Sequence, residues 1–229
     1  MSIFLNRDLF KTPFFIIKIL QREKFKKYSR YFGDRVLDIG CGSKIYRRFI
    51  SPNFYIGLDI SKLSYADIIG NVKCLPFKDN SFDSVIITEV LEHIEEPLIA
   101  LNEIERVLKS SGIVYLTVPM TWGLHYEPAD FWRFTKYSLI YLFKRTNLKI
   151  INLERIGGVF SVVGARLADF LYALISKKLF WFIPFRYSEK IAMLAVFLFS
   201  FFFLYLAKYL DQLDDRDALG WMVLARNEK

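Results

Sequence analysis

The chain has few of the residues that build metal centres and disulfide frameworks. It contains two cysteines and two histidines among 229 residues. Neither cysteine, Cys41 or Cys74, lies in a CxxC pair or beside a histidine. The sequence therefore predicts free thiols in a reducing compartment. Because no metal-ligand spacing is present, we also expect no bound metal.

The N-terminus lacks the features of a secretory signal. Its apolar patch over residues 14–20 is interrupted by Lys18, and no small-residue cleavage site follows. We therefore expect the body of the protein to stay in the cytoplasm.

Apolar residues, by contrast, are abundant. Hydrophobic residues make up 53% of the chain and aromatic residues 17%, more than an ordinary soluble domain needs. A membrane is the simplest apolar environment, besides the protein core, that could take up these residues. The net charge of +8, concentrated in the first thirty or so residues, favours an anionic partner such as a lipid leaflet or nucleic acid.

Residues 1–32 are predicted to form an amphipathic basic arm. Phe10, Phe14, Ile17 and Leu20 recur at helical spacing among lysines and arginines. Such a helix can lie on an anionic membrane. It can equally cap the core with a solvated basic face.

From residue 33 onwards, short apolar runs alternate with helical or turn patterns. This alternation predicts one Rossmann-like, doubly wound, mostly parallel sheet of seven strands with helices on both faces. The expected strands are residues 36–39, 55–58, 67–69, 84–87, 113–118, 149–155 and 221–226. Residues 96–108 carry the clearest helical pattern.

The first expected strand runs into a glycine turn. The segment VLDIGCG covers residues 36–42, and a helix is expected to begin at Ser43 and offer its free N–H groups to a ligand. A dinucleotide-binding GxGxxG loop would need a third glycine where this chain has Ile45. Asp38 would also repel a pyrophosphate, and it suits a cationic ligand instead.

The second expected strand ends at Asp59, about twenty residues beyond the loop, where a carboxylate can accept hydrogen bonds from both hydroxyls of a ribose. Its alternative role is the N-cap of a turn at residues 61–63. Further on, the chain reads LPFKDNSFDSVIITEVLEHIEEP and ALNEIERVLKSSGIVYLTVP. Together with VLDIGCG and GLDIS, these runs resemble the small-molecule branch of the class I S-adenosylmethionine-dependent methyltransferases over roughly residues 35–120.

The resemblance implies a cofactor site for S-adenosylmethionine. Asp38, Gly40, Cys41 and Gly42 would contact its methionine end, Asp59 and Ile60 its ribose and adenine, Asn71 and Val72 would flank the adenine, and Glu89 would close the site. Lys44 and Asn71 depart from the family pattern, which often has glycine and aspartate there. His93, within EVLEHIEEP, is expected to orient a loop rather than to act on substrate.

The acceptor side is expected in the loop MTWGLHYEPADFWRFT, residues 120–135, because loops at the carboxyl ends of parallel strands hold substrates. The candidate catalytic residues are the bases His125, Glu127 and Asp130, with Arg133 as a binder of phosphate or carboxylate. Alternatively, Asp130 and Arg133 form a buried ion pair that orders the loop, with Trp132 filling core.

The last third of the chain contains a charge-free apolar run over residues 191–207. We expect residues 159–217 to form an apolar helical insertion between the core, residues 33–158, and its last strand in residues 218–229. A single crossing would separate the last two strands, so the insertion is expected to lie in the membrane interface, with Trp181, Tyr187, Tyr205 and Tyr209 at headgroup level. A soluble alternative makes it a homodimer interface.

The acceptor-loop segment also resembles a subgroup of these methyltransferases found in bacterial surface-polysaccharide biosynthesis, which implies a lipid-linked saccharide acceptor. The alternatives are an isoprenoid quinone or other membrane lipid, and a scaffold that binds the cofactor without transferring its methyl group. Nucleic acid is not expected, because residues 88–91 read TEVL in place of an Asn/Asp-Pro-Pro-Tyr/Phe tetrad.

Overall fold

The structure, a computed structural model, describes residues 15–179 and 185–229. Phe10, Phe14 and Trp181 lie outside the described residues. The chain has two compact units. One consists of residues 23–155 and 220–229, and the other of residues 1–22 and 156–219.

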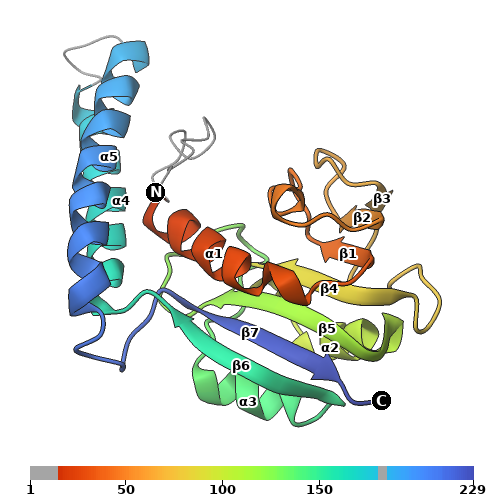
Figure 1. Ribbon diagram of the computed structural model, residues 1–229. Helices are drawn as coiled ribbons and strands as arrows, with labels where there is room; N and C mark the ends of the chain where they lie inside the picture. Colours follow the sequence, from red (N-terminus) through yellow and green to blue (C-terminus); the bar gives the residue numbers. More distant parts are fainter. Residues whose placement is uncertain (1–14, 180–184) are drawn as a thin grey trace. The chain divides into compact units, whose positions relative to one another are not determined.

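The first unit is built on a seven-stranded sheet in the order β3-β2-β1-β4-β5-β7-β6 (Figure 1). The strands β1 to β5 pair in parallel, whereas β7 runs antiparallel to β5. The predicted mostly parallel fold is therefore confirmed. The strand bounds are β1 Arg35–Ile39, β2 Phe54–Asp59, β3 Ile68–Ile69, β4 Phe82–Thr88, β5 Leu108–Pro119, β6 Leu148–Ile156 and β7 Gly220–Asn227.

Apolar side chains explain why the strands lie where they do. The middle strands carry continuous buried runs such as Val85 to Ile87, as expected for a sheet covered on both faces. The second half of the helix α1 (Phe15–Tyr28) lies on one face, where Phe25 contacts Tyr115 at 5.1 Å between ring centroids. The helices α2 (Pro97–Val107) and α3 (Lys136–Phe143) cover the other face (Figure 1).

The register brings the carboxyl ends of β1, β2, β4 and β5 to one edge of the sheet. Ile39 pairs with Leu58 on one side and Ile87 on the other, and Thr88 pairs with Thr117. Because these strands are parallel, the segments that follow them emerge together. This edge is where open α/β sheets bind ligands.

The helix expected at Ser43 is not formed. Residues 43–46 form turns, and only the short 3₁₀ helix η2 (Arg47–Phe49) follows. The physical reason is the backbone of Lys44, whose φ of 53° lies in the left-handed region and cannot begin a right-handed helix. The glycine turn therefore presents no helix N-terminus to a ligand.

Residues 23–28 of the N-terminal arm pack on the core of the first unit. Phe25 and Tyr28 are buried, and the basic side chains of Lys24 and Lys27 bind Glu154 of β6 at 2.5 and 2.7 Å. This arrangement corresponds to the cap on the core that was one of the two expectations for residues 1–32.

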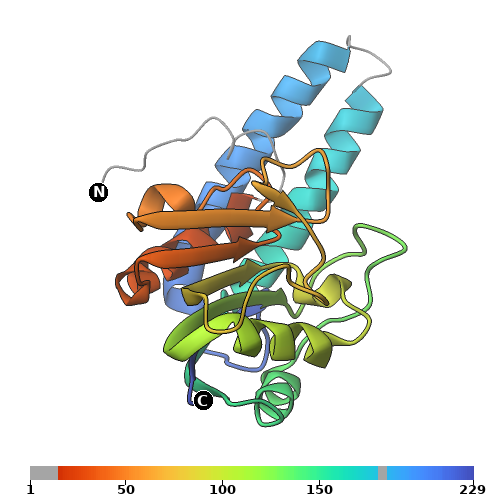
Figure 2. The ribbon, with the colours of Figure 1, turned by 90° about the vertical axis from the view of Figure 1, so that its right-hand side faces the viewer.

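The second unit contains two long helices, α4 (Val159–Leu179) and α5 (Phe185–Leu210), which run side by side in both views (Figures 1 and 2). They pack closely at Gly164, where a Cβ would lie 2.7 Å from the ring of Phe203. Asp211 fixes the start of α4, because its carboxylate accepts hydrogen bonds from the N–H groups of Gly158, Phe160 and Ser161.

Candidate active site

The glycine turn after β1 is built around left-handed backbone. Gly40 and Gly42 have φ values of 67° and 49°. A Cβ on Gly40 would lie 2.2 Å from Cγ2 of Val90, so this position requires glycine. A Cβ on Gly42 would meet nothing within 4 Å, so the backbone at Gly42 borders open space. Lys44 adopts the same left-handed region, which explains why a glycine would suit that position.

Asp59 fastens this turn to the end of β2. Its Oδ2 accepts the N–H of Gly42 at 2.9 Å, and its Oδ1 accepts the N–H of Ser61 at 2.8 Å. The second contact is the capping arrangement anticipated as an alternative, although no helix follows it. Each carboxylate oxygen keeps a further lone pair, so both contacts leave room for a ribose hydroxyl.

Asp38 is the buried acid of the turn, 1% exposed at the end of β1. The Tyr55 hydroxyl donates a hydrogen bond to its Oδ2, whereas Oδ1 has no partner among the described residues. Burial raises the pKa of Asp38 to about 7, and the hydrogen bond from Tyr55 opposes that rise. A cationic donor beside Oδ1 would satisfy this atom.

The other predicted cofactor residues lie around the same turn in different ways. Cys41 is a buried free thiol whose Sγ packs over Gly57, so only its backbone borders the turn. Ile60 is 66% exposed and available to an aromatic ring. Asn71 uses its side-chain oxygen to accept the N–H of Lys73, and Val72 is buried.

Glu89 follows β4 and faces β5. It has a φ of 53°, and its Oε1 accepts a hydrogen bond from the Thr117 hydroxyl at 2.9 Å. Burial raises the pKa of Glu89 to about 7. The sequence indicated Glu89, but Thr117 was missed because only the parallel register of β4 and β5 brings it there.

The acceptor loop is ordered by an ion pair. Arg133 donates to both oxygens of Asp130 at 2.7 and 2.8 Å, and Asp130 has a side chain only 2% exposed. Arg133 also donates to the carbonyl groups of Trp122 and Gly123. The Arg133 guanidinium holds the pKa of Asp130 well below its usual range. The structure thus has the loop-ordering pair that was the alternative for these two residues.

The remaining candidates of this loop differ in exposure. Glu127 is exposed to solvent, whereas His125 is half-buried and its backbone N–H donates to Oδ2 of Asp130 at 2.9 Å. Trp132 does not fill core as expected, since it is 43% exposed and its Nε1 donates to the carbonyl of Ile94. His93 has the expected loop-orienting contact, with Nδ1 2.5 Å from the carbonyl oxygen of Ala129.

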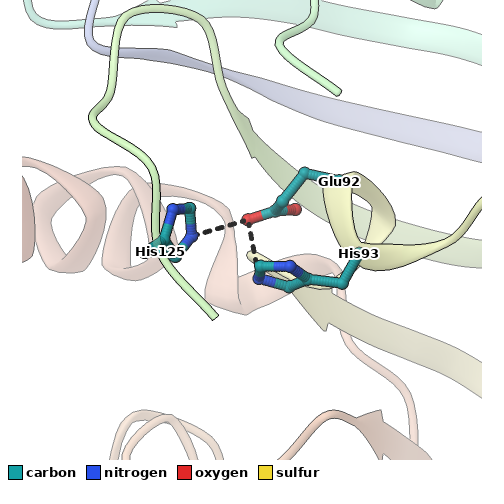
Figure 3. Close-up of side chains that lie close together, drawn as sticks. All are labelled: Glu92, His93 and His125. Carbon is teal, nitrogen blue, oxygen red and sulfur yellow. Dashed lines mark ion pairs between the residues drawn. The ribbon is translucent and has the colours of Figure 1, made fainter. Parts of the chain in front are cut away.

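Glu92 was not singled out from the sequence. It lies in the 3₁₀ helix η3 (Leu91–His93), is fully buried, and its carboxylate lies between the rings of His93 and His125 (Figure 3). The signal for it is weak, because only its place in EVLEHIEEP, three residues after Glu89, distinguishes it from an ordinary acid.

Comparisons with known proteins identify the domain that contains the glycine turn. Residues 37–116, which contain the glycine turn, Asp59 and η3, match the family described as a methyltransferase domain. The fold is similar to the phosphoethanolamine N-methyltransferase 2 of Haemonchus contortus in complex with S-adenosyl-L-methionine. The TM-score is 0.57 at 17% identity, over 97% of this chain and 60% of that one. Residues 37–116 thus form a methyltransferase domain of the class I, S-adenosylmethionine-dependent, small-molecule type, and the sheet has the fold of these enzymes.

The curated relatives match only part of the chain. An uncharacterized protein of Methanocaldococcus jannaschii is 41% identical over 100 residues, which cover 41% of this chain and 44% of that one. The demethylmenaquinone methyltransferase of Renibacterium salmoninarum is 35% identical over 95 residues, 35% of this chain and 39% of that one. The methyltransferase therefore spans less than half the length of each of these two relatives.

The residues around the glycine turn, here called the donor pocket, fit S-adenosylmethionine on three structural grounds. The buried Oδ1 of Asp38 has no partner among the described residues and would accept the cofactor's ammonium group. The open space at Gly42 admits a ligand against the backbone. Asp59 keeps lone pairs for the ribose hydroxyls, and the exposed Ile60 offers an apolar contact to the adenine.

Proposed function

We propose that this methyltransferase transfers a methyl group from S-adenosylmethionine to a hydroxyl oxygen of a lipid-linked saccharide at the cytoplasmic face of the membrane. The observation that carries the proposal is that one chain combines the donor pocket around Asp38 and Gly42 with two long helices rich in exposed apolar residues.

When bound, S-adenosylmethionine supplies an electrophilic methyl group on a sulfonium sulfur. The protein must align the methyl donor with the acceptor and allow the acceptor hydroxyl to lose its proton. Asp38 and Asp59 would hold the donor from opposite ends of the glycine turn. Because Asp130 and Arg133 are committed to each other, we assign them to the shape of the acceptor loop and not to proton transfer or phosphate binding.

The acceptor loop presents aromatic surface suited to a sugar ring. Tyr126, Phe131 and Trp132 are 69%, 45% and 43% exposed. The ring of Trp132 is held by its hydrogen bond to Ile94, so its face is fixed while one side stays in solvent.

The helices α4 and α5 support a membrane-bound acceptor. Residues 193–210 form a window of mean hydropathy 2.0 that is only 17% buried. Such a helix is long and apolar enough to cross a membrane. Because it is followed by β7 of the sheet, we propose that the pair α4 and α5 lies in the interface and does not cross. Its large exposed side chains are Val163, Leu167, Phe170, Ile191, Leu194, Leu198, Phe201, Phe202, Tyr205 and Tyr209.

A second candidate acceptor is an isoprenoid quinone. It is favoured by the likeness of this methyltransferase to the demethylmenaquinone methyltransferase of Renibacterium salmoninarum. A quinone needs an apolar channel to the donor, whereas a saccharide needs polar groups and aromatic faces at the acceptor loop. Methyl transfer from labelled S-adenosylmethionine to extracted glycolipids and to demethylated quinones, assayed side by side, separates the two.

Titration of the detergent-solubilised protein with S-adenosylhomocysteine tests the donor pocket. We expect binding in the wild type and its loss in Asp59→Ala, because that change frees the N–H groups of Gly42 and Ser61 from the carboxylate that fixes the turn. Asp79→Ala is the matched control, since Asp79 is exposed and binds Arg106 instead. A folded wild type that binds no S-adenosylhomocysteine would contradict the proposed function.

Flotation with vesicles of phosphatidylglycerol and phosphatidylcholine tests the membrane part. The wild type should float with the vesicles, and replacing both Phe201 and Phe202 by serine should weaken this association. Leu213→Ser is the control, because Leu213 is 79% exposed but lies beyond the end of α5. If the wild type stays in the dense fraction and sediments as a dimer, the apolar helices serve self-association and the membrane proposal fails.

A further inference from the structure

The only two histidines of the chain meet at one buried carboxylate. His93 stands beside Glu92 in η3, and His125 comes from the loop that follows β5. Oε1 of Glu92 lies 3.8 Å from Nε2 of His93 and 4.0 Å from Nε2 of His125. The three ligand atoms all lie within 4.8 Å of one another (Figure 3).

The Glu92 carboxylate has no hydrogen bond to balance its burial. Glu92 is 0% exposed, and neither Oε1 nor Oε2 has a hydrogen-bond partner among the described residues. The nearby guanidinium of Arg133 is directed to Asp130 instead. A buried carboxylate without partners is strongly unfavourable, so this geometry calls for a positive charge beside Glu92.

The two histidines direct their Nε2 atoms to the same carboxylate oxygen, Oε1 of Glu92. Nδ1 of His93 lies 2.5 Å from the carbonyl oxygen of Ala129, and Nδ1 of His125 lies 3.1 Å from that of Gly123. A carbonyl oxygen only accepts, so these contacts favour the neutral tautomer with the hydrogen on Nδ1 and the Nε2 lone pair facing Glu92. For His125, Nδ1 also lies 3.5 Å from the Asp130 carboxylate, which favours the same tautomer, and 3.5 Å from Nη2 of Arg133, which is further away than the Gly123 carbonyl. A backbone carbonyl that fixes Nδ1–H is the usual support of a histidine that binds metal through Nε2.

We propose that Glu92, His93 and His125 bind one divalent transition-metal ion. Nitrogen and oxygen ligands lie about 2.0 to 2.2 Å from such an ion, so two of them can be up to about 4.4 Å apart. The distances of 3.8 and 4.0 Å from Glu92 fall within this reach. Two imidazoles with one carboxylate suit zinc or iron(II) better than magnesium, which prefers oxygen ligands.

Three protein ligands leave coordination positions open on the acceptor side of the methyltransferase. An acceptor hydroxyl held at such a position has a lowered pKa, and its proton is released to water before methyl transfer. This role rests on the proposed function, whereas the metal site itself does not. The inference also replaces the expectation of metal independence, because the ligands belong to two segments that only the fold brings together.

The test is cobalt(II) titration of the tag-free, chelator-treated full-length protein, followed by visible absorption and calorimetry. We expect one equivalent to bind and to give the absorption bands of nitrogen-coordinated cobalt. Glu92→Gln and His125→Asn should each weaken binding by about 100-fold or more, since even supporting residues around a metal are worth 10- to 100-fold. Glu95→Gln is the matched control, because Glu95 is an exposed glutamate only three residues further on.

Thermal unfolding separates a lost ligand from a misfolded protein. After chelation, Glu92→Gln should be more stable than the wild type, because the amide removes a buried charge that has no partner. Adding cobalt should reverse this order. Wild-type binding no tighter than that of Glu92→Gln would overturn the metal site. Binding of S-adenosylhomocysteine is measured separately, so failure of the metal site and failure of the proposed function give different results.

Discussion

The proposed donor and acceptor sides of the methyltransferase domain lie on the same edge of one sheet but are held together differently. On the donor side, Gly42 and Ser61 are fixed by a single carboxylate, Asp59, through backbone contacts of 2.9 and 2.8 Å. On the acceptor side, the His93 ring of η3 bonds to the carbonyl of Ala129 in the loop after β5, and the loop itself is held by the Asp130 carboxylate, which binds Arg133 and the backbone N–H of His125. The donor side therefore depends on backbone conformation, and the acceptor side depends on charge.

The largest effect should come from breaking the donor side at Gly40. Gly40→Ala places a Cβ 2.2 Å from Val90 in left-handed backbone, and we expect a loss of about 3 kcal/mol in the free energy of unfolding. Gly42→Ala, with a similar backbone but open space around it, should cost only about 1 kcal/mol and act mainly on cofactor binding. Urea unfolding measures the first effect and calorimetry the second. Equal destabilisation by the two alanines would contradict the role given to Val90.

The sequence predicts the donor side better than the acceptor side, because the signals for the donor side are local. The strands and the glycine turn were predicted because their signals are local: a run such as Val85–Ile87 is buried through its own composition, and VLDIGCG is contiguous. The helix at Ser43 was predicted wrongly, because the left-handed backbone of Lys44 is imposed by the turn and is not coded by a glycine there.

The acceptor side was predicted only in part because its partners are distant in sequence. The loop was located, and the Asp130–Arg133 pair was foreseen as one of two alternatives, since the two residues are three positions apart. Glu92 was missed, and His125 was predicted only as one of three candidate bases. Their proximity depends on the parallel pairing of β4 with β5, which brings η3 and the loop after β5 together.

An intermediate effect should follow from breaking the acceptor side at its charge pair. Arg133→Met leaves Asp130 buried without its guanidinium; because the Arg133 side chain is 24% exposed, we expect a loss of about 2 kcal/mol, less than for a fully buried pair. Arg145→Met is the matched control, because Arg145 is exposed and binds only the Tyr141 hydroxyl among the contacts described. Urea unfolding of both variants measures the difference. Similar stabilities would show that the pair does not order the loop.

The smallest expected effect concerns the protonation of Asp38, which makes cofactor binding on the donor side depend on pH. Burial raises the pKa of Asp38 to about 7, from 3.8 for an ordinary aspartate. The protonated form is thus favoured in the folded, ligand-free protein. The stability that protonated Asp38 gives the folded protein is fully present below about pH 4 and is lost as the pH rises through 7. An ammonium group, by contrast, binds better at higher pH, because it needs the ionised carboxylate of Asp38.

The affinity for S-adenosylhomocysteine should therefore increase about tenfold between pH 6 and pH 8 and level off above, as the linkage for one group with a pKa near 7 requires. Asp38→Asn should bind more weakly at pH 8 and show no such rise. This variant changes no side chain of the acceptor side. A rise that persists in Asp38→Asn would assign the pH dependence to the acceptor side, whereas its loss would place the ammonium group at the unpartnered Oδ1 of Asp38.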